Sequence, residues 1–169
     1  KIAGSKEILP TRLTFVDIAG LVRGASKGEG LGNKFLSHIR EVDAVMHVVR
    51  CFEDGDVTHV EGSVDPLRDI GIIDTELALK DMETVEKRLA KDERAAKSQD
   101  KKAKASVEVW NKLLAALNQG KAARSVELTE DEADIARELQ LLTSKPILYC
   151  CNVLESEIHT GNKHVEVVR

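Results

Sequence analysis

Short apolar runs alternate with glycine and aspartate in the first part of the chain. Residues 11–18 (TRLTFVDI) and 44–52 (AVMHVVRCF) are rich in valine, leucine and phenylalanine and are too short for ordinary helices, so each predicts a strand. Residues 31–41 between them predict a helix. A further apolar run, residues 147–153 (ILYCCNV), predicts a third strand, buried on both faces. Strand, helix and strand in this order form the unit of a parallel α/β sheet.

Two apolar stripes with heptad spacing occupy the middle of the chain. Each predicts a helix with one buried face, and together they predict an antiparallel helical hairpin. The polar stretch between the stripes either continues one of the helices or forms a turn, and Gly120 supplies a stop for the second helix. The first stripe consists of Ala78, Met82, Val85 and Leu89, and the second of Val107, Trp110, Leu114 and Leu117.

A further helix is expected after the hairpin. Thr129 followed three residues later by Glu132 is a capping box, which marks a helix start. The expected buried stripe of this helix is Ile135, Leu139 and Leu142, and Pro146 is expected to end it. The sheet thus resumes after a long helical interruption.

Composition narrows the class of protein. Lys and Arg number 25 and Asp and Glu 29, for a net charge of −4, which argues against a dispersed, charge-driven affinity for nucleic acids such as DNA, although it leaves room for a local basic patch. No apolar run approaches the roughly 20 residues that span a bilayer. Cys51, Cys150 and Cys151 make an odd set with two adjacent members, which favours reduced, buried thiols in a cytoplasmic protein. The chain begins with Lys1 instead of methionine, so we expect a piece of a longer protein.

Residues 17–34 (DIAGLVRGASKGEGLGNK) form a glycine-rich run that ends in lysine, a composition typical of phosphate-binding loops. The phosphate-loop motif requires glycine before the lysine and serine or threonine after it, whereas Asn33 and Phe35 stand there. The dinucleotide motif fails too, because Asn33 takes the place of its third glycine. The run is therefore neither of these two cradles.

Two short motifs remain, each at the end of a predicted strand. Asp17 and Gly20 form D-x-x-G, in which the carboxylate holds Mg²⁺ through water and the glycine N–H approaches a terminal phosphate. An aspartate that merely caps the next loop is the alternative. Asn152, Val153 and Glu155 stand where a GTPase carries N-K-x-D, the motif that reads guanine. This order and these positions are what a nucleotide pocket requires.

The stretch FVDIAGLVRGASKGEGLGNKFL, with HVVRCF, the helical interruption and the NVLE ending, closely resembles the YchF (Obg-like ATPase) family of P-loop NTPases, which are related to translation factors. The resemblance implies an α/β fold: part of a Ras-like P-loop NTPase domain with a mostly parallel sheet and an inserted antiparallel α-helical coiled-coil hairpin. Residues 1–70 and 129–169 would be parts of the G domain, and residues 71–128 the hairpin. The family's Walker A loop and TGS domain have no counterpart in these 169 residues, so we expect weak or no ATP binding by them alone, and exposed apolar sheet edges.

The resemblance also implies an activity. Family members cleave the β–γ bond of ATP, often in preference to GTP, with Mg²⁺, and associate with the large ribosomal subunit in the cytoplasm. Asp17 and Gly20 would sense Mg²⁺ and the γ-phosphate, and residues 21–33 would be the mobile switch. Leu21 occupies the position of the glutamine that usually orients water, so another group must do so. His59 is the candidate; a loop histidine without chemistry is the alternative.

A binding module is the other function open to this sequence. In that case the hairpin, roughly residues 71–119, docks on a protein or RNA partner such as the ribosome, and the G-domain part is a scaffold without turnover. The lysines between the helices either contact RNA phosphates or form a solvated face; they are Lys97, Lys101, Lys102 and Lys104. For the hydrolase, Glu155 in place of aspartate weakens the grip on guanine and permits ATP.

Overall fold

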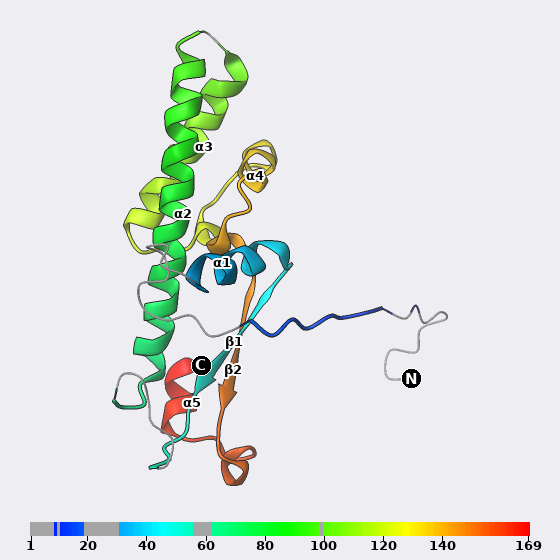
Figure 1. Cartoon of the computed structure of the whole chain (residues 1–169), viewed down its shortest axis with the longest axis vertical. Helices are drawn as coiled ribbons and strands as arrows, with labels where there is room; N and C mark the ends of the chain where they lie inside the picture. Colours follow the sequence, from blue (N-terminus) through cyan, green and yellow to red (C-terminus); the bar gives the residue numbers. More distant parts are fainter. Residues whose placement is uncertain (1–8, 10, 19–30, 56–61, 99) are drawn as a thin grey trace.

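The structure is a computed structural model that describes residues 9, 11–18, 31–55, 62–98 and 100–169. A long pair of helices dominates the structure, and the longer of the two runs on alongside a small parallel sheet, with shorter helices beside both (Figure 1). The helices and strands of the described residues are α1 (Leu31–Glu41), β1 (Val45–Arg50), α2 (Pro66–Ala96), α3 (Lys101–Asn118), α4 (Glu130–Arg137), β2 (Ile147–Asn152) and α5 (Lys163–Val168). Single 3₁₀ turns, η2 (Ala123–Ser125), η3 (Leu142–Ser144) and η4 (Glu155–Glu157), connect them.

Strands β1 and β2 pair in parallel, with Val45 opposite Ile147 and Arg50 opposite Asn152. Burial alternates along β2, and Leu148 is 66% exposed, so the prediction of a strand buried on both faces was wrong. The reason is that α2 and α5 pack on the sheet from one side. On the outward face the apolar side chains of Met46, Val48 and Leu148 are exposed.

The strand predicted at residues 11–18 does not form. This segment has no regular secondary structure, and Phe15 within it is 70% exposed. A strand is stabilised by hydrogen bonds to a neighbour, and in the described part of the chain the sheet consists of β1 and β2 alone. High β-propensity therefore did not suffice here. Ile18, by contrast, packs against a buried cluster.

The two long helices are capped where sequence signals suggest. Asp65 accepts a hydrogen bond from Arg68 N at the start of α2, and Pro66 occupies the first turn. Asp100 caps α3, so the polar stretch continues both helices, α2 as far as Ala96 and α3 from Lys101, with a turn between them. Gly120, at a φ of 72°, follows the end of α3 in the left-handed conformation that favours glycine.

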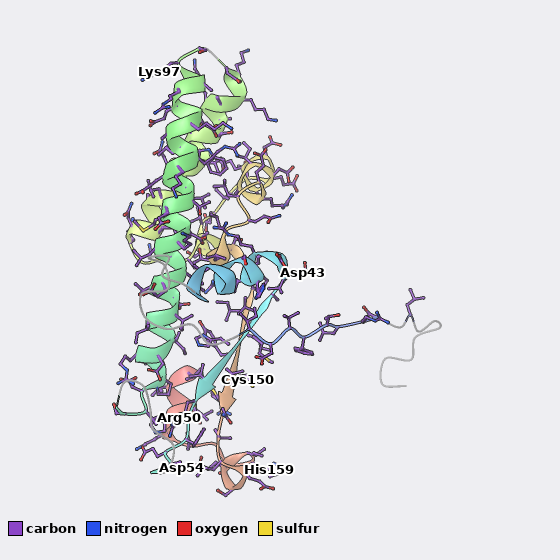
Figure 2. The ribbon with its side chains drawn as sticks, in the orientation of Figure 1. Asp43, Arg50, Asp54, Lys97, Cys150 and His159 are labelled. Carbon is purple, nitrogen blue, oxygen red and sulfur yellow. The ribbon has the colours of Figure 1, made fainter. Side chains whose placement is uncertain are left out.

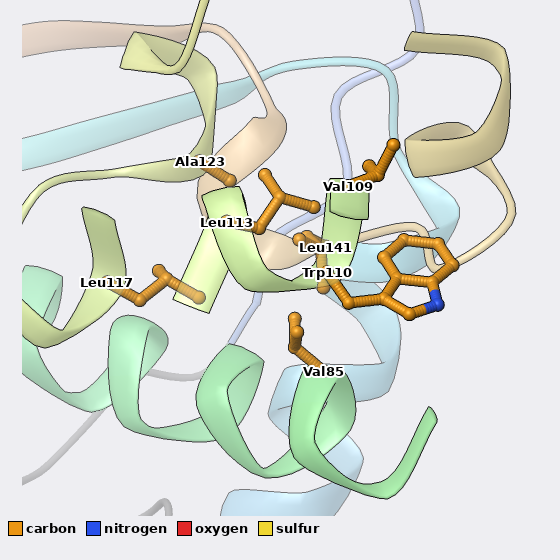
Figure 3. Close-up of a cluster of buried hydrophobic side chains, with 7 residues drawn as sticks. All are labelled: Val85, Val109, Trp110, Leu113, Leu117, Ala123 and Leu141. Atoms are coloured by element: carbon orange, nitrogen blue, oxygen red, sulfur yellow. The ribbon is translucent and has the colours of Figure 1, made fainter. Parts of the chain in front are cut away.

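A cluster of buried side chains joins α2 and α3 to the segment after α3 (Figure 3). Of the predicted stripes, Val85, Trp110 and Leu117 are fully buried, whereas Val107 and Leu114 are only half-buried. The sequence stripe missed two core residues of α3 because that helix contacts α4 and η2 as well as α2. The cluster consists of Val85, Val109, Trp110, Leu113, Leu117, Ala123 and Leu141.

The capping box at Thr129 is confirmed, with both reciprocal hydrogen bonds to Glu132 present. Helix α4 ends at Arg137, well before Pro146, so the predicted length was wrong. Gln140 adopts a left-handed φ of 46° just beyond the helix. Leu142 consequently belongs to η3 and to a second buried cluster with Leu36, Ile39 and Leu77, not to an α4 stripe.

Candidate functional site at the carboxyl edge of the sheet

The carboxyl ends of β1 and β2 lie at one edge of the sheet, where ligands of parallel sheets collect. Cys51 N donates to the carbonyl oxygen of Asn152 across 2.8 Å, so the two strands stay paired up to this edge. Arg50 and Asp54 lie on the β1 side of this end (Figure 2). The segments after both strands are thereby held next to each other.

The N-x-x-E segment leaves β2 at this edge. Asn152 is the last residue of β2 and is exposed, and Val153 is half-buried. Glu155 begins η4 and is exposed. Glu157 accepts a hydrogen bond from Leu154 N at 3.4 Å, which closes the turn. The structure thus places the three predicted base-contacting residues on one tight turn with both polar side chains facing solvent.

Asn162 anchors this turn to the end of β1. Its Oδ1 accepts from the N–H groups of His164 and Val165, which caps α5. Its Nδ2 donates to Cys51 O at 2.7 Å and to Glu157 Oε2 at 2.8 Å. Sequence reasoning missed both Asn162 and α5. The signal was an asparagine immediately before a short apolar run, which is a helix start.

Charged side chains reinforce the same anchor. Oε1 of Glu53, in the segment after β1, lies 2.8 Å from Lys163 Nζ and 3.1 Å from His164 Nε2. Lys163 first, and His164 second, lower the pKa of Glu53 below its usual value. The Arg50 guanidinium lies 4.6 Å from the centre of the Phe52 ring and donates to Phe52 O. The segment after β1 is therefore held by contacts within itself and with α5.

The three cysteines differ in environment. Burial, assisted by a hydrogen bond with Cys151, raises the pKa of the buried Cys51 thiol to about 12, so it stays protonated and is a poor nucleophile. Cys150 is exposed on the outward face of the sheet, so the expectation that all three are buried was wrong. The alternation along β2 explains this, because neighbouring residues of a strand face opposite sides.

Asp17 lies apart from this edge among the described residues. Its carboxylate is exposed, and the neighbouring Ile18 packs against the cluster of Leu36, Ile39, Leu77 and Leu142 near the amino ends of the strands. No contact joins Asp17 to Asn152 or Glu155 in the described part of the structure. The meeting of the two motifs around one nucleotide stays a prediction. Gly20, Leu21 and His59 lie outside the described residues.

Two further properties concern metal ions and membranes. The described residues contain no group of three or more His, Cys, Asp and Glu side chains that could hold a metal ion. A single carboxylate such as Asp17 is an oxygen donor of the kind that Mg²⁺ accepts through water, so its chemistry fits the ion without a dedicated protein cage. None of the described helices is both long enough and apolar enough to cross a membrane.

Comparison with known proteins shows the family to which this chain belongs. A model for 50S ribosome-binding GTPases matches residues 2–112. The ribosome-binding ATPase YchF of Bacillus subtilis is 53% identical over the whole of this chain, which covers 47% of that protein. Obg-like ATPase 1 of Saccharomyces cerevisiae is 45% identical over 93% of this chain, and the match covers 41% of that protein. The chain thus spans about half the length of these curated relatives.

A solved structure has the same fold. The YchF GTPase of Schizosaccharomyces pombe superimposes with a TM-score of 0.73 at 39% sequence identity. The match covers 86% of this chain and 40% of that one. The described elements therefore correspond to a P-loop GTPase-like α/β fold.

Proposed function

Because this chain belongs to the YchF/Obg-like ATPase family of 50S ribosome-binding GTPases, we propose that it forms the central part of a ribosome-associated nucleotide hydrolase in the cytoplasm. The reaction is cleavage of the β–γ bond of ATP, with GTP less preferred. The observation that carries the proposal is the exposed N-x-x-E turn at the carboxyl edge of two parallel strands, where a nucleotide base binds in this fold class.

In the base site, Asn152 braces the neighbouring segment and Glu155 faces the ring. The Glu155 carboxylate stands one methylene further out than the aspartate of N-K-x-D, which spoils a two-point hydrogen bond to guanine. Val153 replaces the lysine that covers guanine in that motif. Together these two differences support binding of ATP.

The test of the base site is a double substitution in the intact protein. Val153→Lys with Glu155→Asp should shift the ratio of kcat/KM values from ATP toward GTP. Glu166→Asp, which shortens an exposed carboxylate on α5, is the matched control and should leave the ratio unchanged. An ATP-to-GTP ratio that the double substitution does not move would show this account of the base site to be wrong.

In the phosphate site, Asp17 would hold Mg²⁺ through water and the Gly20 N–H would bind the γ-phosphate. Bound Mg²⁺ would neutralise charge on the phosphate oxygens. Leu21 cannot hydrogen-bond to water, so we assign His59 to orient the attacking water. His59→Ala in the intact protein should lower kcat, whereas His159→Ala, at an exposed histidine beyond η4, should not. Unchanged turnover in the first variant would remove His59 from the mechanism.

The division of the chain follows from this function. Residues 1–70 and 129–169 are parts of the G domain, and residues 71–128 are an inserted antiparallel coiled-coil hairpin. The Walker A loop, which makes most contacts to phosphate, has no counterpart in the 169 residues. The isolated chain should therefore bind ATP weakly and turn over none. Micromolar binding of ATP by the isolated chain, measured by titration calorimetry, would contradict this expectation.

A second function, partner binding by the hairpin, is supported by exposed lysines at its far end. Lys97 lies at this tip (Figure 2), and Lys101, Lys102 and Lys104 follow in the first turn of α3. Within the described residues, none of these four lysines forms an ion pair with a carboxylate. Their charges are therefore available to RNA phosphates. Replacing the four with glutamine in the intact protein should weaken sedimentation with ribosomes and leave basal hydrolysis unchanged. Full ribosome binding by this variant would assign the lysines to a solvated face.

A further inference from the structure

A carboxylate in the middle of α2 is completely removed from solvent. Asp81 has 0% exposure, and its two oxygens accept three hydrogen bonds from η3. Leu142 N donates to Oδ1 at 2.8 Å, and Thr143 donates to Oδ2 through both its N–H and its hydroxyl at 2.7 Å. Burial raises the pKa of Asp81, and these hydrogen bonds oppose the rise. Such a group is retained where it fixes the position of another segment.

Thr143 extends the contact to the exit of the hairpin. Its hydroxyl oxygen accepts from Ala123 N at 3.0 Å, in the turn that follows α3. Its carbonyl oxygen accepts from Arg124 Nη1 at 3.2 Å. Asp81 and Thr143 therefore tie the entry helix of the hairpin, the exit of the hairpin and η3 into one hydrogen-bonded group, which we call the Asp81 junction.

Helix α1 reaches the same place. Arg40 Nη2 donates to Thr84 Oγ1 of α2 at 3.1 Å, and the Arg40 carbonyl accepts from Lys145 Nζ at 3.0 Å. The Arg40 charge acts on Asp81 and is one of the influences that lower its pKa. Its Nε is buried without a hydrogen-bond partner in the described part of the chain. A buried donor without a partner destabilises the arrangement to which it belongs.

The Asp81 junction lies directly before the strand that carries the proposed base site. η3 ends at Ser144 and β2 begins at Ile147, so the junction sets the position of β2. Asn152, at the other end of β2, opens the base-contacting turn. The chain from the junction to that turn runs through a strand that is paired with β1 over its whole length, so a displacement of α2 at Asp81 would reach the turn through it.

We propose that Asp81 is a positioning residue that couples partner binding on the hairpin to nucleotide binding at the Asn152–Glu155 turn. The inference rests on the proposed function, since it requires both a nucleotide and a hairpin partner. Coupling is reciprocal: whatever factor the partner applies to nucleotide affinity, the nucleotide applies to partner affinity. Asp81 itself touches neither ligand.

The experiment compares two buried carboxylates of α2 in the intact protein. Asp81→Asn replaces an acceptor with a donor facing the Thr143 N–H. Asp92→Asn is the matched control, since Asp92 is also buried on α2 but binds Trp110 and Arg88 within the hairpin region. The Kd of a fluorescent ATP analogue is measured with and without saturating ribosomes, and the ratio of the two values is the coupling factor.

We expect a wild-type coupling factor of about 5-fold or more, falling below about 2-fold in Asp81→Asn and unchanged in Asp92→Asn. An unchanged factor in Asp81→Asn, an equal loss in Asp92→Asn, or a wild-type factor of one would each overturn the proposal while nucleotide binding stands. Absence of nucleotide binding in the wild type would instead refute the proposed function.

A gentler pair of variants keeps the test valid if Asp81→Asn does not fold. Thr143→Val removes the hydroxyl that bridges Asp81 and Ala123 and keeps the backbone N–H bond. Thr143→Ser restores the hydroxyl. The coupling factor should fall in the valine variant and recover in the serine variant. Equal factors in the two variants would show that the junction is only structural.

Discussion

Replacing Trp110 with phenylalanine would test what holds α2 against α3. Trp110 is fully buried, and its Nε1 donates to Asp92 Oδ2 at 2.8 Å. Arg88 Nε donates to the same oxygen at 2.8 Å, and the Arg88 guanidinium lies 5.7 Å from the centre of the indole ring. Phenylalanine keeps an aromatic ring in the core but leaves Asp92 without its donor from α3.

Two effects add in this variant. A hydrogen bond to a charged group contributes about 1.5–3 kcal/mol. The smaller ring also leaves a cavity of about 40 Å³, which at about 24 cal/mol per Å³ costs about 1 kcal/mol. The free energy of unfolding should therefore fall by about 2.5–4 kcal/mol. Urea denaturation followed by circular dichroism at 222 nm measures the change.

A double-mutant cycle separates the two effects. Trp110→Phe and Asp92→Ala share the hydrogen bond, so their effects should deviate from additivity by about 1–2 kcal/mol. Leu117→Ala with Asp92→Ala is the control cycle, because Leu117 lies two turns further along α3, and it should be additive within about 0.5 kcal/mol. A Trp110–Asp92 coupling energy below about 0.5 kcal/mol would refute the assignment of stability to this bond.

Three further predictions follow from single groups. Burial alone would raise the pKa of Asp92, but the hydrogen bonds from Trp110 and Arg88 lower it below its usual value. Ionised Asp92 thus contributes to the free energy of unfolding above about pH 4, the usual pKa of aspartate. This contribution is lost as the pH falls through the lowered pKa that Asp92 has in the folded protein. The stability difference between wild type and Asp92→Asn should accordingly narrow from pH 7 to pH 2 in urea titrations. In the folded protein a thiol reagent at pH 8 should modify the exposed Cys150 rapidly and the buried Cys51 only as fast as the protein unfolds. Mass spectrometry measures the two rates of modification. Equal rates would contradict the burial of Cys51. Thr129→Ala should lower stability by about 1 kcal/mol and Thr129→Ser by much less, and equal losses in thermal denaturation would mean that the cap hydroxyl contributes nothing.

Local signals in the sequence predicted most elements of the fold. The capping box at Thr129 and the helix at residues 31–41 depend on neighbours within four residues, and both form as expected. The strands near residues 45–50 and 147–152 were predicted because they are short apolar runs. The failures depend on distant partners. Residues 11–18 are also rich in residues that favour strands, but they pair with no described strand.

The same distinction holds for the candidate site. The sequence predicted that Asn152 and Glu155 follow the carboxyl end of a strand, and β2 does end at Asn152. That they meet Asp17 around one nucleotide stays a prediction. Asn162 and Asp81 act through hydrogen bonds to residues 111 and 62 positions away, and a polar residue within a helix or loop gives no sign of such a partner. The end of α4 was misjudged for a related reason. Asp81 binds the N–H groups of Leu142 and Thr143, which a longer helix would have used.

Helix α2 is continuous over 31 residues, which at 1.5 Å per residue makes a rod about 46 Å long. Asp81 stands at its midpoint, and the first half of the rod packs on β1 and α5 while the second half extends to the lysine-bearing tip. If such a rod pivots where it is held at its centre, its two ends move in opposite directions. A tilt of about 10° moves each end by about 4 Å in opposite directions. A displacement of the lysine-bearing tip by such a tilt would therefore move the end of α2 that packs on β1 and α5 by a similar distance in the opposite direction.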